Sequence, residues 1–388
     1  MDSSHCHVCQ APDLDLIPRF SELPGVTSDC RPWPNGADLG ICTNCGTVQK
    51  VATARWHEAV GSIYTNYSLY HQSDIRAEDQ SFDPASGMGQ ARSKQLLQVL
   101  APQIDFTRRG WALDFGAGIG VTLRAFHKLA PDWRLDAYEP NLKDEERLSK
   151  LAGVSAVHSG PLEDLQGQYD CVLCMHVLEH VIDPVRVLAR VGGLLNDGGR
   201  LIIQVPYFRD NAFDLMIVDH CSHFTLASLT RILHRAGFDI VTGSTSIVER
   251  EITIVASRRR SPDNATGHIE PNSDRAFVLN AGSWLRHLID QNRALADRAD
   301  QFGIFGTSIA ATFIANALDG GVAFFVDEHP ARIGSRHMGR PIYSPEATPN
   351  GAVVSLVLMP STAARIGRRL ERQRMTLHYP PPLDMVVC

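Results

Sequence analysis

The sequence predicts an α/β protein with two sheet-containing regions, preceded by a small cysteine-rich region. Short apolar runs alternate with segments of helical period over residues 111–257, which is typical of a mostly parallel sheet. The same alternation returns over residues 302–360. Between them, residues 258–274 are polar and contain Pro, Asn, Gly and Ser, as expected of a linker. Residues 1–50 are rich in Cys, Pro and Gly and lack long apolar periods.

The composition is that of a globular chain of two or three domains. The 388 residues include 37 Lys and Arg and 43 Asp and Glu, which gives a net charge of −6. A hydrophobic content of 44% and a charged content of 21% argue against disorder or a fibrous architecture. No window approaches the roughly 18 apolar residues of a membrane span. The mild acidity argues against a nucleic-acid-binding surface.

We expect three domains, at residues 1–60, 61–260 and 275–388. The second would begin with a helical lead-in over residues 61–105. A long helix is predicted near the start of the third domain, because apolar residues recur there at three- and four-residue steps. These residues are Phe277, Ala281, Trp284, Leu285, Leu288 and Leu295.

Two Cys-x-x-Cys pairs near the N-terminus predict a structural zinc site. They are Cys6 with Cys9 and, after 32 intervening residues, Cys42 with Cys45, followed by Gly46. Two residues between thiolates allow both sulfurs of a turn to point at one ion, and two such turns complete a tetrahedral sulfur site. The metal would supply folding energy to a segment with a thin core.

The same four cysteines are also compatible with roles other than a structural zinc site. They could be buried free thiols or a redox pair, or the ligands of a zinc ribbon that binds nucleic acid. The last is disfavoured, because Arg19, Arg31 and Lys50 are the only basic residues of the region. The chain has nine cysteines, an odd number, and no apolar run like a signal peptide at its first residues. We therefore expect a reducing, cytoplasmic location.

A glycine-rich turn follows the first predicted strand of the 111–257 region. Gly116, Gly118 and Gly120 would let the backbone approach a ligand closely and place a helix N-terminus beside it. Asp114 precedes the first glycine, where dinucleotide-binding turns usually carry an apolar residue. Glu139 ends the next predicted strand, at the spacing from which a carboxylate can accept hydrogen bonds from ribose hydroxyls.

Two motifs carry a family resemblance. They are D-F-G-A-G-I-G at 114–120 and Y-D-C-V-L-C-M-H-V-L-E-H-V-I-D-P at 169–184. Together with the acidic strand end between them, they resemble the class I S-adenosylmethionine-dependent methyltransferases over residues 105–257. The resemblance implies a Rossmann-like core that binds S-adenosylmethionine. A nicotinamide-binding turn is the alternative, which Asp114 and the second motif disfavour.

The resemblance also implies roles for individual residues. Asp114 would orient the methionine amino group of the cofactor, Glu139 would bind the ribose, and His176 would lie near the sulfonium or the acceptor. The remaining residues implied at the cofactor are Gly116, Ala117 and Gly118 at the methionine part, Pro140 after the ribose ligand, and Leu162 and Glu163 beside the adenine.

The whole domain order is similar to that of zinc-containing bacterial sugar C-methyltransferases. Phe302-Gly-Ile-Phe-Gly-Thr-Ser308 resembles the second glycine turn of that family, and residues 325–334 with 339–342 resemble its D-x-N-P-x-K-x-G…G-x-P segment. Those enzymes methylate the carbon beside a ketone in nucleotide-linked keto-deoxysugars. The resemblance implies that the C-terminal domain holds part of a nucleotide-sugar. Neither a nucleic acid nor a membrane is implied as a partner, and the oligomeric state stays open.

Residues 217–225 are similar to the acceptor loop of the sugar C-methyltransferases, H-E-H-L-x-Y-F-S. Alignment on Phe224 places His220 on the family's base, Asp219 on its Glu and His223 on its Tyr. An imidazole suits removal of a proton beside a carbonyl. The change from Tyr to His alters the substrate wall, so methylation of oxygen or nitrogen, or of a non-sugar metabolite, is the alternative.

Tyr64 and Tyr67 resemble the family's tyrosine pair that contacts the acceptor. If the segment is helical, steps of three residues would place both tyrosines on one face. An aromatic packing face is the alternative interpretation of this pair.

Overall fold

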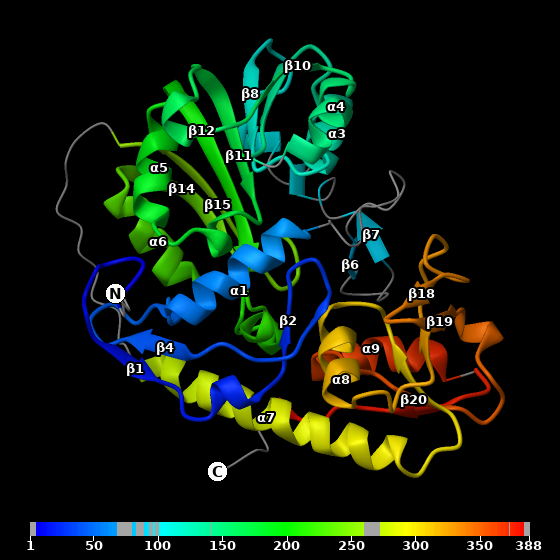
Figure 1. The fold of residues 1–388 in the computed structure, drawn as a ribbon. Helices are drawn as coiled ribbons and strands as arrows, with labels where there is room; N and C mark the ends of the chain where they lie inside the picture. The colour runs from blue at the N-terminus through cyan, green and yellow to red at the C-terminus, as the bar shows by residue number, and fades with distance from the viewer. Residues whose placement is uncertain are drawn as a thin grey trace.

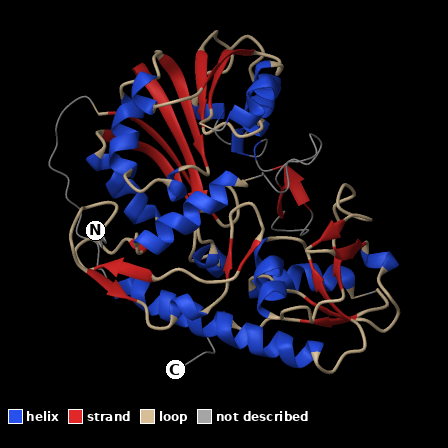
Figure 2. Cartoon of the chain, viewed as in Figure 1, coloured by secondary structure: helices blue, strands red, loops and turns tan. Residues whose placement is uncertain are grey.

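The computed structural model describes residues 5–67, 80–82, 89–91, 93, 96, 97, 101–140, 142–259, 272–371 and 373–383. Figures 1 and 2 show a large sheet flanked by helices, a smaller sheet with helices at the other end of the chain, and N-terminal strands between them. Tyr70, Cys388 and most of the predicted linker lie outside the described residues.

The large sheet has seven strands in the order β10-β9-β8-β11-β12-β15-β14. The first five are parallel, and β15 pairs antiparallel with both of its neighbours. From β8 the chain adds β9 and β10 on one side of the sheet, and then β11 and β12 on the other side. The direction of winding therefore reverses between β8 and β11. Ligands bind at such a point in open α/β sheets. The strands are β8 (Trp111–Phe115), β9 (Arg134–Tyr138), β10 (Val154–His158), β11 (Tyr169–Met175), β12 (Leu195–Pro206), β14 (Phe238–Ser244) and β15 (Glu251–Arg258).

Separate apolar layers cover the two faces of this sheet. Helix α3 (Val121–Leu129) and α4 (Glu145–Ser149) pack on the face that contains Cys171. Helices α5 (Pro184–Gly192) and α6 (Leu226–Arg235) pack on the face that contains Cys174. The two cysteines of β11 thus point to opposite faces, as strand alternation predicts. These layers confirm the predicted Rossmann-like α/β core.

The C-terminal sheet repeats the same winding. Its six strands run β18-β19-β17-β16-β20-β21, with β18 antiparallel at the edge and the other five parallel. A second reversal of winding therefore lies between β16 and β20. The elements are β16 (Phe302–Phe305), α8 (Ile309–Ala317), β17 (Phe324–Val326), β18 (Arg336–His337), β19 (Arg340–Tyr343), β20 (Val353–Ser355), α9 (Pro360–Leu370) and β21 (Thr376–His378).

The N-terminal region shares a sheet with the large domain. Its four-stranded sheet has the order β1-β4-β5-β13, and β13 (Ser222–His223) comes from the loop that follows β12. We expected residues 1–60 to form a separate domain, but β5 of this region pairs with β13 in the loop after β12. The other N-terminal elements are β1 (Leu14–Leu16), η1 (Phe20–Glu22), β2 (Gly25–Val26), β3 (Pro32–Trp33), β4 (Leu39–Cys42), β5 (Val48–Lys50) and α1 (Ala54–Thr65).

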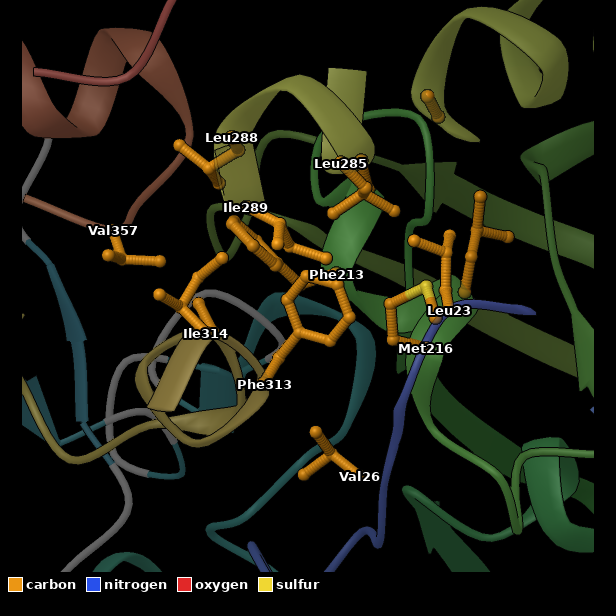
Figure 3. Packing of buried hydrophobic residues seen from close by; sticks show 14 of the residues in the cluster. Leu23, Val26, Phe213, Met216, Leu285, Leu288, Ile289, Phe313, Ile314 and Val357 are labelled. Carbon is orange, nitrogen blue, oxygen red and sulfur yellow. The ribbon is translucent and has the colours of Figure 1, made fainter. Parts of the chain in front are cut away.

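Helix α7 (Asn272–Ala296) runs along the base of the molecule and joins all three parts (Figure 1). It contains the predicted long helix. Leu285 and Leu288 of α7 belong to one buried cluster with Phe213 of the turn η6 (Ala212–Met216), with Phe313 of α8 and with Leu23 of the N-terminal region (Figure 3). One apolar core therefore spans the three predicted domains, whose exact limits stay predictions.

The predicted helical lead-in over residues 61–105 contains helix and strand. Its described residues form the end of α1, the antiparallel pair β6 (Gln80–Phe82) and β7 (Gly89–Ala91), helical residues at Ser93, Leu96 and Leu97, and the turn η2 (Ala101–Gln103). After β11, Glu179 lies in a single turn, η5 (Leu178–His180), and α5 begins only at Pro184, where the Asp183 side chain caps it. Proline fixes that start because it lacks an N–H and suits the first helical turn.

The remaining elements are short turns, and the described helices contain no membrane-spanning candidate. The turns are η3 (Leu142–Asp144), η4 (Leu162–Asp164) and η7 (Pro345–Ala347). Among the helices that the structure describes, none combines the length and apolar character that a bilayer crossing requires.

Truncating Trp284 tests the shared core. The side chain is fully buried, and its indole N–H donates to the Pro381 carbonyl at 2.9 Å. Trp284→Ala should lower the free energy of unfolding by about 3–5 kcal/mol, since a large cavity opens. Chemical denaturation should show one transition shifted for every probe. Val241→Ala, at a side chain that is 42% exposed, is the control. A loss confined to the C-terminal sheet would contradict the shared core.

Candidate active site

One cavity of 1320 Å³ receives residues from all three parts of the chain. The ends of β8 and β11 open onto it through Gly116 and His176, and the ends of β16 and β20 through Gly306 and Leu358. The two points of reversed winding therefore face the same space. Ser28 of the N-terminal region also lines the cavity. Its volume exceeds the roughly 300–1,000 Å³ typical of a site for one small ligand.

The glycine turn after β8 forms one wall of the cavity. Gly116 has φ +82°, and a Cβ there would lie 2.4 Å from Val177 Cγ2, so a side chain is excluded by both backbone and space. The N–H groups of Gly116 and Ala117 donate to the Tyr138 carbonyl at 2.8 and 3.1 Å. Gly120, with φ +79°, begins α3 without a side-chain cap. A helix N-terminus beside glycines, whose backbone a ligand can approach closely, is suited to bind a polar ligand.

Two carboxylates stand at this wall. Glu139 lines the cavity, and its Oε2 accepts from the Gly118 N–H at 2.8 Å. Asp114 is buried beneath the turn, and its Oδ2 has no hydrogen-bond partner among the described residues. Burial, with the nearby Glu139 charge, raises the pKa of Asp114 to about 7. An unpartnered buried carboxyl costs free energy, which a cationic amino group would recover.

The structure assembles most of the predicted cofactor residues but separates two of them. Leu162 and Glu163 lie on η4 and are not among the described residues that line the cavity. Glu163 is exposed and pairs with Arg186 of α5. The expected place of both residues beside the adenine stays a prediction. The predicted residues that line the cavity are Gly116, Ala117, Gly118, Glu139, Pro140 and His176.

His176 ends β11 in an unusual conformation. Its φ is +56°, a backbone region that non-glycine residues rarely adopt and that often marks functional sites. Its N–H donates to the Gln204 carbonyl at 2.8 Å. The imidazole lies between two buried carboxylates, with Nδ1 at 3.3 Å from Glu179 and Nε2 at 3.7 Å from Glu251. His176 therefore sits on the cavity wall next to the glycine turn, as predicted.

A buried carboxylate holds two histidines of the loop after β12. Asp214 Oδ1 lies 2.8 Å from His220 Nδ1, and Oδ2 lies 2.6 Å from His223 Nδ1. His220 lines the cavity, which leaves Nε2 as the nitrogen able to serve a ligand. Burial opposes its protonation, but the charge and hydrogen bond of Asp214 outweigh burial and raise the pKa of His220. The arrangement orients the ring and favours proton uptake by it.

His223 is not among the described residues that line the cavity, and its catalytic role stays a prediction. It is buried in β13, pairs with Val48 of β5, and its ring packs against Phe208. Burial lowers its pKa to about 4, against the pull of Asp214. The pairing of β13 with β5 explains the burial of His223, whereas His220 precedes β13 and lines the cavity. His223 instead anchors Asp214.

Asp219 is also buried behind the cavity wall. Its carboxylate accepts from the Ser28 N–H at 2.8 Å and from the Ser28 hydroxyl. Ser28 Oγ in turn lies 3.4 Å from the Tyr67 hydroxyl. Asp219 was expected beside the acceptor base, but it is not among the described lining residues and contacts His180 rather than His220. Its contacts instead hold Ser28 and His180, two residues that line the cavity.

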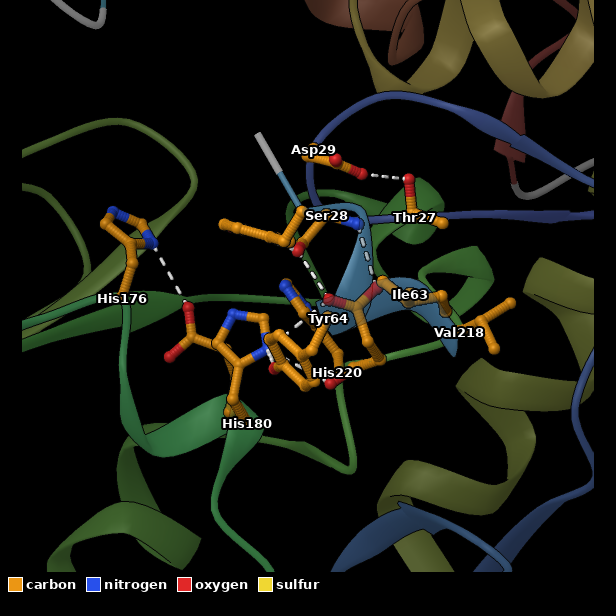
Figure 4. Close-up of polar contacts among 12 residues, drawn as sticks. Thr27, Ser28, Asp29, Ile63, Tyr64, His176, His180, Val218 and His220 are labelled. Atoms are coloured by element: carbon orange, nitrogen blue, oxygen red, sulfur yellow. Dashed lines mark hydrogen bonds and ion pairs between the residues drawn. The ribbon is translucent and has the colours of Figure 1, made fainter. Parts of the chain in front are cut away.

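The two predicted tyrosines line the cavity together with His180. The Tyr64 and Tyr67 rings lie 5.5 Å apart, and Tyr64 Oη is 3.0 Å from His180 Nδ1. The His180 ring stands perpendicular to that of His220 at 4.7 Å (Figure 4). Burial lowers the pKa of His180, as does His220. These hydroxyl and imidazole groups form a polar corner opposite the glycine turn.

Sequence reasoning missed Asp214 and Ser28. Asp214 stands in the apolar run Ala-Phe-Asp-Leu-Met, and a charge in such a run signals a buried partner, which could have been noticed. Ser28 lies 191 positions before Asp219 and has no local signal. Only the folded hairpin β2–β3 brings it to the site.

The C-terminal wall carries its own polar network. Thr307, in the glycine turn after β16, donates to Asp327 Oδ2 at 2.9 Å, and Arg332 lies 3.2 Å from the same oxygen. Glu328 pairs with Arg369 of α9. All five residues line the cavity beside the N-terminus of α8. This wall mirrors the first one, with a glycine turn followed by an acidic end of the second strand.

The four predicted metal ligands converge at the edge of the N-terminal sheet. The sulfurs of Cys6, Cys9, Cys42 and Cys45 all lie within 4.8 Å of one another. Two of the distances are 3.4 Å, between Cys6 and Cys45, and 3.5 Å, between Cys9 and Cys42. Backbone N–H groups of both turns approach the sulfurs at 3.4–3.5 Å. Four thiolates at tetrahedral spacing fit one zinc ion.

Comparison with known proteins identifies one part of the chain. Residues 89–242 match a family model described as a methyltransferase domain. An uncharacterised 37.1 kDa protein in transposon TN4556 of Streptomyces fradiae is 27% identical over 56% of this chain and 68% of its own length. The C-methyltransferase NovU of Streptomyces niveus is 23% identical over 44% of this chain and 43% of its own.

Further relatives cover shorter stretches. A ubiquinone biosynthesis O-methyltransferase of Xanthomonas axonopodis pv. citri is 32% identical over 27% of this chain and 47% of its own length. The chain thus spans less than half the length of the named methyltransferases among these relatives. Among solved structures, the dimethyltransferase RosA from Streptomyces davawensis has a TM-score of 0.37 at 25% identity, covering 43% of this chain and 53% of that one.

Replacing Asp214 tests the carboxylate that holds the two histidines. Asp214→Asn removes the anion that raises the pKa of His220, while burial, which lowers it, remains. The pKa of His220 should therefore fall below its ordinary value. NMR titration of ¹⁵N-histidine-labelled protein measures it, with His220→Gln to assign the resonance and the exposed Asp239→Asn as control. An unchanged His220 pKa would contradict the proposed contact.

Proposed function

We propose that the chain uses its S-adenosylmethionine-dependent methyltransferase domain to C-methylate a nucleotide-linked keto-deoxysugar, with His220 as the base. The observation that carries this proposal is the position of His220. It faces the same cavity as the glycine turn, and Asp214 fixes its ring. A base held at the cofactor's cavity is what carbon methylation beside a ketone requires.

The cofactor would occupy the wall formed by the turn after β8. S-adenosylmethionine supplies an activated methyl group on its sulfonium. Asp114 would receive the amino group of its methionine part, since its buried Oδ2 lacks a partner among the described residues. Glu139 would exchange its contact with the Gly118 N–H for ribose hydroxyls. His176, between Glu179 and Glu251, would border the sulfonium.

The acceptor would fill the remainder of the cavity, toward the C-terminal sheet. His220 Nε2 would remove the proton on the carbon beside the ketone, and Asp214 would stabilise the resulting imidazolium. Tyr64 and Tyr67 would hold sugar oxygens, since both hydroxyls lie at the cavity. Burial raises the pKa of both phenols, so both stay protonated as donors. The surrounding walls would exclude water from the enolate.

The nucleotide part of the acceptor would bind at the second point of reversed winding. Its turn after β16, the N-terminus of α8 and the side chains of Arg332 and Arg369 face the cavity. Helix N-termini and arginines suit phosphate groups. The size of the cavity supports two ligands at once, and the similarity to a protein named C-methyltransferase supports a carbon acceptor.

Methylation of a hydroxyl or an amine is the second candidate. The relative named as a ubiquinone biosynthesis O-methyltransferase has a higher percentage identity than the C-methyltransferase, although over a shorter stretch. An oriented imidazole can deprotonate a hydroxyl as well as a carbon. The two candidates differ in one property, because only carbon methylation requires removal of the carbon-bound proton.

We further propose that Cys6, Cys9, Cys42 and Cys45 hold a structural zinc ion. The four side chains leave no position open for a substrate, which is typical of structural sites. Two contacts dock this region on the large domain, His7 Nδ1 to Ser222 Oγ at 3.1 Å and Arg231 to the Cys45 carbonyl. The remaining described cysteines are buried and form no disulfide with one another, which fits the reducing environment of a cytoplasm.

Solvent exchange separates the two candidate functions. With a nucleotide-linked 4-keto-deoxysugar and S-adenosylhomocysteine in D₂O, the proton beside the ketone should exchange in the wild type and not in His220→Ala. Because the base must be neutral, the rate should rise with pH through the pKa of His220, which Asp214 raises above its ordinary value. NMR or mass spectrometry measures the exchange. Methyl transfer without any exchange in the wild type would favour oxygen or nitrogen as the acceptor.

Glu139 provides a test of cofactor binding alone. Glu139→Gln should weaken S-adenosylmethionine binding by about 10- to 100-fold, because hydrogen bonds to a charged group contribute roughly 1.5–3 kcal/mol. Isothermal titration calorimetry measures the affinity. The matched control is Glu145→Gln on the exposed side of α4, which should bind as the wild type does. Equal affinity of both variants would remove Glu139 from the cofactor site.

Metal analysis tests the zinc ligands. The purified chain should contain about one zinc ion, and Cys42→Ser should lose it together with stability, since the metal contributes folding energy. Cys171→Ser, at a thiol buried in β11 away from the cluster, is the control and should keep the metal. Full zinc content in Cys42→Ser would contradict the ligand assignment.

A further inference from the structure

We propose that Lys50, from the N-terminal region, is a positioning residue whose ammonium group acts through Asp214 on the catalytic His220. The inference rests on the proposed role of His220 as base. It gives the cysteine-rich region a part in the chemistry beyond a structural one. Three features of Lys50 support it: its fixed backbone, its complete burial, and the contact of its ammonium with the Leu215 carbonyl, next to Asp214.

The backbone of Lys50 is fixed to the acceptor loop. Lys50 is the last residue of β5, and its N–H donates to the Cys221 carbonyl at 2.9 Å. The two residues before it pair with β13, Gln49 with Ser222 and Val48 with His223. The lysine therefore keeps its position relative to the loop that carries His220, which immediately precedes Cys221.

The Lys50 side chain is buried to an extent that is rare for a lysine. It is 1% exposed, and its ammonium donates to the Leu215 carbonyl, next to Asp214. The ring of Phe20 lies 5.4 Å from Nζ, within the range of a cation–π contact. Lysine is almost never fully buried without a compensating partner. No surface function accounts for this side chain, which points into the protein beneath the histidine loop.

Two carboxylates of the site favour the charged form of Lys50. Burial lowers the pKa of Lys50 to about 7, and the charges of Asp214 and Asp219 oppose that shift. Lys50 in turn contributes to the low pKa of His223. The other titratable groups of this cluster interact with Asp214, Asp219 or His220; they are Glu179, His180, Cys221, Tyr64 and Tyr67.

The consequence for His220 follows from the balance of charge. Without a nearby cation, two buried carboxylates would raise the pKa of the histidines, and His220 would stay protonated. The ammonium of Lys50 offsets part of that negative charge, so His220 is free as a base at lower pH. Removing the cation should raise the pKa of His220, because the imidazolium then meets an uncompensated Asp214.

The test is Lys50→Met, which keeps much of the side-chain volume but removes the charge, with the exposed Lys150→Met as matched control. ¹⁵N-histidine NMR should show the pKa of His220 raised by about one pH unit in Lys50→Met, a tenfold change in proton affinity. The acid limb of kcat/KM should move by the same amount, with activity recovered at alkaline pH. An unchanged His220 pKa in a folded Lys50→Met protein would overturn the proposal.

A measurement on the wild type covers the case in which Lys50→Met does not fold. In ¹⁵N-lysine-labelled protein, the Lys50 Nζ resonance should be that of an ammonium group at the acid end of the pH range in which His220 titrates, below the Lys50 pKa of about 7. An amine already neutral at that acid end would overturn the proposal. Both NMR measurements need no acceptor, so a failure to find methyl transfer would count against the proposed function and leave the result on Lys50 standing.

Discussion

The carboxylate of Asp214 is the contact on which the candidate site depends. It lies on η6, whose neighbours Phe213 and Leu215 belong to the core shared with α7 and α8. From there it holds His220 toward the cavity and His223 behind it. Because β13 pairs with β5, the same contact ties the cysteine-rich region to the site. A buried carboxylate between two imidazoles is stable only while all three side chains remain in place. The packing around Asp214 therefore determines where Nε2 of His220 lies.

The cavity owes its size to two sheets of the same winding that face each other. Each sheet places a glycine turn, a helix N-terminus and an acidic strand end at its rim, represented by Gly116 and Glu139 on one side and by Gly306 and Asp327 on the other. One sheet wound in this way provides a crevice for one ligand. Two opposed crevices allow a methyl donor and an acceptor to be held in fixed relation, which is the main contribution a protein makes to methyl transfer.

The sequence predicts the fold further than it predicts the site. The strands of both sheets, the long helix and the cysteine cluster follow from local patterns, because hydrophobic period and Cys-x-x-Cys spacing act over a few residues. His220, Tyr64 and Glu139 were also placed at the cavity from motifs. His223 and Asp219 were not, since the burial of His223 depends on the pairing of β13 with β5 and that of Asp219 on its contacts with Ser28. Ser28 and Lys50 could not be found from local sequence at all, as only the long-range pairing of β5 and the hairpin β2–β3 brings them to the loop.

The central claim is that one cavity aligns S-adenosylmethionine with a carbon acceptor bound through its nucleotide. The most direct measurement is methyl transfer from S-adenosylmethionine labelled with ¹³C in the methyl group to a panel of nucleotide-linked keto-deoxysugars, with the product examined by NMR. The account predicts a labelled methyl group bonded to the carbon beside the ketone. A label found on a hydroxyl or amine, or the absence of labelled product with every nucleotide-sugar, would contradict it.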